Sequence, residues 1–115
     1  GIHTSGGSDA PVVSFDAMEN IYFAVTRKNI SGQPQEGWIP SEKISVDEAV
    51  KLFTKNAAYA SYTEDENGTI EVGKNADFVV LEKNIYEIDP DEIKVTKVDM
   101  TVLGGEIVYE RKVEE

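Results

Sequence analysis

The segment 95–113, "VTKVDMTVLGGEIVYERKV", decides the fold class of this chain. Apolar and polar residues alternate on both sides of Gly104-Gly105, and this period of two is typical of β-strands. Two adjacent glycines supply the positive φ angles that a tight hairpin turn requires. The segment therefore predicts an antiparallel hairpin, in which Val98, Met100 and Val102 share one face of the first strand.

A third strand is predicted upstream of this hairpin. The run "DFVVLE" at 77–82 is short and almost continuously apolar, which is typical of a strand buried on both faces. Asn67-Gly68 and Gly73 mark turns before it. The organisation is thus helices first and antiparallel strands last, with a break near residue 62.

Two helices are predicted in the first half of the chain, over about residues 16–28 and 46–60, because apolar residues recur there at helical spacing. Each helix opens with a capping box, in which an Asp or Ser precedes a Glu by three positions: Asp16 with Glu19, and Ser45 with Glu48. Residues 29–44, "NISGQPQEGWIPSEKI", contain two prolines and two glycines and are expected to form a long loop. Loops of this length are often functional.

The composition excludes several classes of partner. The chain has 115 residues, one domain's worth, with 11 Lys and Arg against 22 Asp and Glu and a net charge of −11. Because this field repels phosphates and anionic lipid, neither nucleic acid nor a membrane is expected as a partner. No apolar run approaches the ~18 residues that cross a bilayer, and no signal peptide is visible. The lack of cysteine excludes disulfides and fits a cytoplasmic protein.

Four motifs together resemble one family: "GGSDAPV" at 6–12, "NAAYAS" at 56–61, "GTIEVGKNADFVVLEKN" at 68–84 and "MTVLGGEIVYE" at 100–110. They are similar to the carboxyl-terminal end of the metal-dependent amidohydrolase superfamily, in particular its YtcJ-like branch, also called amidohydrolase family 3. The last two motifs are the most specific. The resemblance covers nearly the whole chain, from Gly6 to about Tyr109, and includes a Thr-x-Asn-x-Ala pattern at 54–58.

The resemblance implies an architecture. As an isolated chain the class is α+β. Residues 1–62 correspond to the end of a (β/α)₈ TIM-like barrel, with the eighth strand and the helices that follow it. Residues 63–115 correspond to the strand portion of a small composite β-sandwich, which strands from the amino-terminal end of the whole enzyme complete in this family.

The resemblance also assigns the chemistry to Asp9. Ser8-Asp9 matches the end of the eighth strand, where the family's aspartate binds the metal and takes a proton from the attacking water. A carboxylate can ligate a divalent ion through one oxygen and accept a proton through the other. From the residues alone, an aspartate that precedes a proline turn is also typical of an Asx-turn. Asp9 is thus the candidate catalytic residue and metal ligand.

Three further residues carry a functional and a structural alternative. Trp38, between Gly37 and Pro40, is a candidate substrate-binding residue of a lid over the barrel mouth, or an aromatic anchor that holds the loop to the surface. His3 is expected to be solvated rather than a ligand. Asp77 is expected to serve a turn or cap rather than catalysis.

The parent protein is expected to hydrolyse a non-peptide C–N bond, amide or N-acyl, by metal-activated water. The resemblance implies a divalent metal, zinc, in the full-length parent. A catalytic zinc needs about three protein ligands. This chain has one histidine, no cysteine and one aspartate in the motif, so we expect it to be inactive and free of metal on its own.

Three kinds of partner are expected: the missing amino-terminal part of the same enzyme, a small-molecule amide substrate, and further copies of the chain in a homo-oligomer, because bare strand edges pair readily. The alternative function is a standalone, non-catalytic interaction or regulatory module, in which Asp9 is vestigial. Some relatives in this family carry an exoenzyme-regulatory label.

Overall fold

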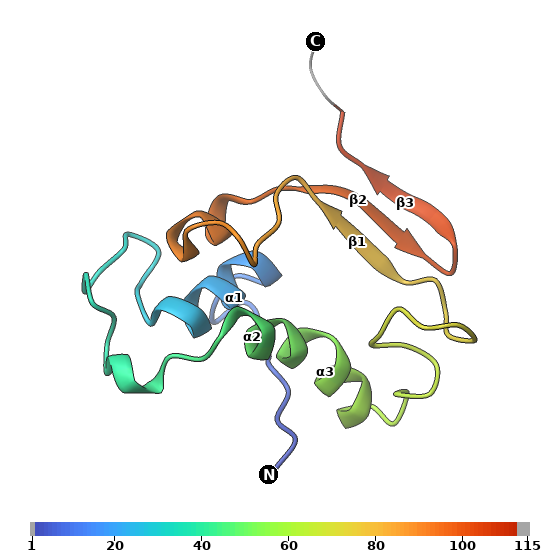
Figure 1. Cartoon of the computed structure of the whole chain (residues 1–115), viewed down its shortest axis with the longest axis horizontal. Helices are drawn as coiled ribbons and strands as arrows, with labels where there is room; N and C mark the ends of the chain where they lie inside the picture. Colours follow the sequence, from blue (N-terminus) through green and yellow to red (C-terminus); the bar gives the residue numbers. More distant parts are fainter. Residues whose placement is uncertain (1, 113–115) are drawn as a thin grey trace.

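The computed structural model describes residues 2–112 and confirms the predicted order of helices followed by antiparallel strands (Figure 1). The helices are α1 (Ala17–Thr26), α2 (Val46–Phe53) and α3 (Lys55–Ala60), with 3₁₀ turns η1 (Pro40–Glu42) and η2 (Pro90–Val95). The strands are β1 (Phe78–Leu81), β2 (Val98–Leu103) and β3 (Glu106–Glu110). They form one antiparallel sheet in the order β1-β2-β3, so the chain is α+β.

Both predicted helix starts are confirmed, but of the two predicted capping boxes the described contacts form the second alone; at α1 Asp16 caps the helix without Glu19. Asp16 caps α1, because its Oδ1 accepts a hydrogen bond from the Met18 backbone N over 2.8 Å. Ser45 and Glu48 form a reciprocal capping box at α2: Ser45 Oγ accepts from the Glu48 N, and Glu48 Oε2 accepts from the Ser45 N. Helix α1 ends at Thr26, two residues before the predicted end.

The prediction of one continuous helix over 46–60 was wrong. The helix breaks at Thr54, which has φ −127° and ψ −97° and separates α2 from α3. The Thr54 hydroxyl donates to the Val50 carbonyl oxygen over 2.8 Å and so occupies the acceptor that the Thr54 N–H uses in a regular helix. That N–H donates instead to the Lys51 carbonyl oxygen.

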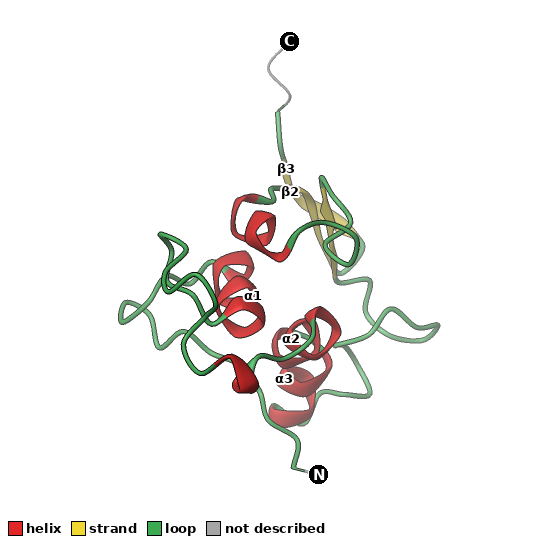
Figure 2. Ribbon diagram, turned by 60° about the vertical axis from the view of Figure 1, so that its left-hand side comes forward, coloured by secondary structure: helices red, strands yellow, loops and turns green. Residues whose placement is uncertain are grey.

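The hydrophobic core lies between α1, α2 and the segment that leads into β2. Figures 1 and 2 show η2 lying along α1, and α1 beside α2. The buried cluster consists of Met18, Ile21, Tyr22, Val25, Ala49, Ile85 and Ile93. Tyr22 and Ile93 are fully buried. The core therefore joins residues from both sides of the break predicted near residue 62.

The hairpin prediction is confirmed, with φ +58° at Gly104 and +82° at Gly105. The expectation that 77–82 is buried on both faces was wrong: Phe78, Val79 and Val80 are 37%, 53% and 42% exposed. Strand β1 lies at one edge of the sheet and pairs with β2 alone among the described strands. An apolar run predicts burial only where other strands or helices cover it.

Among the described residues, no strand ends at Ser8-Asp9; an eighth barrel strand in a longer protein stays a prediction. Residues 2–8 are irregular, and they lie beside the α2–α3 region rather than beside the sheet. A strand forms only where a neighbouring strand accepts and donates its backbone hydrogen bonds.

None of the helices in residues 2–112 combines the length and the apolar character that a membrane-spanning helix needs.

Candidate functional site

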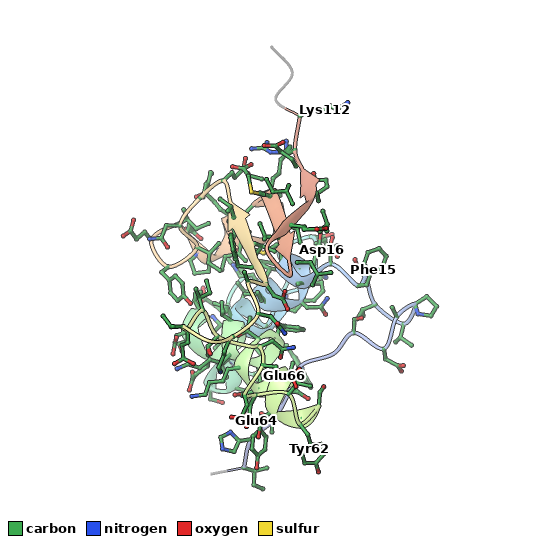
Figure 3. The ribbon with its side chains drawn as sticks, turned by 90° about the vertical axis from the view of Figure 1, so that its right-hand side faces the viewer. Phe15, Asp16, Tyr62, Glu64, Glu66 and Lys112 are labelled. Atoms are coloured by element: carbon green, nitrogen blue, oxygen red, sulfur yellow. The ribbon has the colours of Figure 1, made fainter. Side chains whose placement is uncertain are left out.

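Asp9 lies in an exposed turn between the first segment and α1. Its φ is +48°, a conformation that aspartate tolerates better than most residues, and its carbonyl oxygen accepts a hydrogen bond from the Val12 N over 2.9 Å. The Asp9 residue is exposed, and Ser8 is half-buried. Figure 3 shows the loop that leads to Phe15 projecting from the body of the molecule. The carboxylate is thus accessible to a cation, to water or to a substrate.

The segment before Asp9 is fixed on α2 and α3. The Gly6 N donates to the Leu52 carbonyl oxygen over 3.0 Å, and Asn56 Nδ2 donates to the Thr4 carbonyl oxygen over 2.9 Å. Gly6 packs so closely that an added Cβ would lie 2.7 Å from Phe53 Cζ. These contacts set the register of the segment on the helices.

The segment after Asp9 is fixed on the first turn of α1. Asn20 Nδ2 donates to the Ser14 and Asp16 carbonyl oxygens over 2.8 and 2.7 Å. The Asp16 N donates to Ser14 Oγ over 3.1 Å. The loop that carries Asp9 is therefore held at both ends by side-chain amides.

His3 lies at the start of the anchored segment and is exposed, as expected. Its ring lies against the ring of Tyr59 on α3, with centroids 4.6 Å apart. Among the described contacts, none joins His3 to Asp9.

Trp38 is tied to the carboxyl end of α1. The Trp38 N donates to the Arg27 carbonyl oxygen over 2.8 Å, Arg27 Nε donates to the Trp38 carbonyl oxygen over 2.9 Å, and Arg27 Cζ lies 5.1 Å from the centroid of the Trp38 rings. The residue is still 64% exposed. These contacts support the anchor alternative and leave a face of the ring accessible. No contact in the described range brings Trp38 to Asp9.

The expected structural role of Asp77 is confirmed. Its Oδ1 accepts a hydrogen bond from the Gly104 N over 2.7 Å, so the side chain caps the hairpin turn. Asp77 also borders an open cavity of about 510 Å³ between α3 and β1. Neither Asp9 nor Trp38 lines this cavity. No sequence motif predicts this cavity, because its walls come from the end of α2, from α3, from the loop after α3 and from the start of β1.

The described residues do not by themselves fit a catalytic metal. Within 2–112, no three His, Asp or Glu side chains lie close enough together to hold an ion, and no cysteine is present. A catalytic zinc needs about three protein ligands. Asp9 offers one carboxylate, which is fewer ligands than such a site needs.

Comparison with known proteins gives one consistent result. A family model described as "Amidohydrolase family" matches residues 1–109. The protein YtcJ of Bacillus subtilis is 40% identical over 111 residues, and the N-substituted formamide deformylase of Arthrobacter pascens is 34% identical over 111 residues; each alignment covers 96% of this chain. The crystal structure of an amidohydrolase from Thermotoga maritima MSB8 superposes with a TM-score of 0.66 and 25% identity over 96% of this chain.

The chain spans only a part of each of these proteins: 21% of YtcJ, 20% of the deformylase and 24% of the Thermotoga protein. The family model nevertheless covers almost the whole chain, including the Ser8-Asp9 turn and the hairpin. This chain therefore belongs to the amidohydrolase family, in its YtcJ-like branch.

Proposed function

We propose that this chain is the carboxyl-terminal part of a longer metal-dependent amidohydrolase, which hydrolyses an amide or N-acyl C–N bond outside peptides. The match of the family model to residues 1–109 supports the proposal. The name of the Arthrobacter relative, an N-substituted formamide deformylase, denotes such a hydrolysis in that protein. Because the chain spans about a fifth of these relatives (21% and 20%), the proposal assigns the other barrel strands and metal ligands to another part of the same protein.

The observation that carries the proposal is the Asp9 turn, an exposed carboxylate on a loop held at both ends. In the proposed reaction Asp9 accepts a proton from the attacking water and returns it to the leaving nitrogen, so that the products are a carboxylic acid and an amine. Asp9 would hold a divalent metal, zinc by family resemblance, through one carboxylate oxygen, together with ligands from outside the described residues. When bound, such a metal would supply polarisation of the substrate carbonyl and a lower pKa for water.

The proposed setting is the cytoplasm, since the chain lacks cysteine, and its net charge of −11 disfavours nucleic acid and anionic membranes as partners. The amino-terminal part of the same protein is the proposed partner of the exposed β1 strand. Trp38 stays a candidate contact for the substrate.

The test is Asp9→Asn in the full-length protein, because the amide can neither accept the proton nor bring a negative charge. We expect turnover of a panel of N-substituted formamides and N-acyl amines to fall by roughly 10²- to 10⁴-fold, with an unchanged circular dichroism spectrum. Asp65→Asn, in an exposed loop, is the matched control. Near wild-type turnover in Asp9→Asn would contradict the proposal. A coding sequence that starts close to Gly1 would instead favour the standalone module.

A further inference from the structure

The side chain of Asn56 connects two distant parts of the chain. Asn56 lies on α3 and is half-buried, and its Nδ2 donates to the carbonyl oxygen of Thr4, 52 positions away, over 2.9 Å. Thr4 is five residues before Asp9. A hydrogen-bond donor is needed here, because the partner is an acceptor; the Asn56 amide supplies one, whereas a carboxylate has no proton to donate at neutral pH.

A second contact limits how the segment from Thr4 to Asp9 can shift. Two residues after Thr4, the Gly6 N donates to the Leu52 carbonyl oxygen over 3.0 Å, and the Phe53 ring fills the space beside Gly6. Residues 4 and 6 are thus bound to position 56 on α3 and position 52 on α2, on either side of the break at Thr54. Two adjacent attachment points fix the direction of the segment as well as its location.

The Asp9 side chain has no attachment of its own within the described range. No residue between 2 and 112 makes a hydrogen bond to its carboxylate, and its backbone makes one turn hydrogen bond, from the Val12 N. The position of the carboxylate therefore depends on how the loop is anchored at its two ends. The segment before Asp9 is held by α2 and α3, and the segment after it is held by α1.

We propose that Asn56 is a positioning residue for Asp9, which acts by holding Thr4 and so placing the Asp9 turn at the reacting atoms. This inference rests on the proposed function, in which Asp9 is the proton acceptor. Asn56 itself does not touch the substrate. A displacement of about 1 Å in a catalytic group can cost roughly 10²-fold in rate, which is the scale of effect expected here.

The experiment compares full-length variants with the best substrate of the formamide and N-acyl amine panel. Asn56→Asp removes the donor at constant size and places an oxygen against the Thr4 carbonyl oxygen. We expect kcat per folded protein to fall roughly 10- to 100-fold, with KM within about twofold. Asn75→Asp makes the same charge change at an exposed position before β1 and should leave kcat unchanged.

The decisive measurement repeats Asn56→Asp in the Asp9→Asn background. A residue that acts through Asp9 should cause no further loss of kcat there, whereas a residue with only a structural role should cause the same fold-loss in both backgrounds. Gly6→Ala displaces the same segment by contact with Phe53 and should reproduce this pattern if Asn56→Asp does not fold. Asn56→Gln retains a donor and should recover part of the rate.

The two proposals fail in different ways. Undiminished turnover in Asp9→Asn contradicts the proposed function. Loss of turnover in Asp9→Asn together with wild-type kcat in both Asn56→Asp and Gly6→Ala contradicts the positioning role alone, as does an equal loss in both backgrounds.

Discussion

Asp77 and Gly104 are joined by a hydrogen bond of 2.7 Å from the Gly104 N to Asp77 Oδ1, although 27 positions separate them. The neighbouring Gly105 N donates to the Ala76 carbonyl oxygen over 3.0 Å. The hairpin turn between β2 and β3 is therefore attached to the entry of β1, and the attachment aligns the first strand with the other two.

Loss of the Asp77 acceptor should destabilise the sheet. We expect Asp77→Ala to lower the free energy of unfolding by about 1–2 kcal/mol, because the Gly104 N–H loses its partner. Asp77→Asn retains Oδ1 and should cost less, and Asp65→Ala is the control. Urea denaturation measures the free energy of unfolding of the three variants. Equal losses of stability in Asp77→Ala and Asp77→Asn would show that the hydrogen bond to the Gly104 N does not stabilise the sheet.

The loop that carries Trp38 depends on close approach at Gly37. Gly37 and Gly32 have nearly the same φ, +81° and +80°, but an added Cβ meets the Thr26 carbonyl oxygen at Gly37 and nothing within 4 Å at Gly32. Gly37→Ala should therefore be less stable than Gly32→Ala by roughly 1–3 kcal/mol. Both variants place alanine at a positive φ, but in Gly37→Ala the added methyl group also overlaps a neighbouring atom. Thermal denaturation of the pair tests this, and equal melting temperatures would argue against a tight contact.

The capping box of α2 should make stability depend on pH. Two hydrogen bonds to the Glu48 carboxylate hold its pKa below the ordinary value of 4.5. The one from the Ser45 backbone N has the larger effect, and the one from the Ser45 hydroxyl the smaller. A lowered carboxyl pKa stabilises the folded state above the ordinary value, and this contribution disappears as the pH falls through the folded pKa. The stability difference between wild type and Glu48→Gln should thus shrink as the pH falls from above 4.5 through the lower folded pKa of Glu48, as measured by urea midpoints. Glu66→Gln is the control, and a difference independent of pH would contradict the assignment.

The isolated chain should have no stoichiometric zinc site, because Asp9 is one ligand of about three that are needed. Calorimetric titration of the 115-residue chain with zinc checks this. One-to-one binding at micromolar affinity or tighter that disappears in Asp9→Ala would show that the chain supplies a complete site. In the full-length protein, by contrast, Asp9→Asn should reduce the metal content measured by elemental analysis.

The exposed strand edges should cause the isolated chain to associate. Val79 and Val80 are exposed on the edge strand β1, and Ile107 and Val108 are exposed on β3 at the opposite edge. Unpaired edges of this kind pair with other copies, and at about 0.15 M salt the negative charge is screened beyond ~8 Å. Light scattering at tens of micromolar should show a dimer or larger species. Val79→Lys should reduce the fraction of the chain in that species. A monomer of 12.7 kDa with a cooperative melt would contradict the prediction.

The sequence alone was sufficient for features that depend on residues within a few positions of one another. The Asp16 cap, the Ser45–Glu48 box and the Gly104-Gly105 turn each involve neighbours along the chain, so their hydrogen bonds form wherever the local backbone adopts the matching angles. The family motifs also identified Asp9 as the candidate, since they are read residue by residue.

Tertiary structure alone decided what lies beside these local features. The exposure of β1 depends on which strands are present to cover it, and the irregular course of residues 2–8 depends on the lack of a neighbouring strand in the described chain. The Asn56–Thr4 contact spans 52 positions, and no periodic pattern in the sequence predicts it. Such contacts are set by the packing of whole elements, because burial and long-range hydrogen bonds depend on distances in space rather than on spacing along the chain.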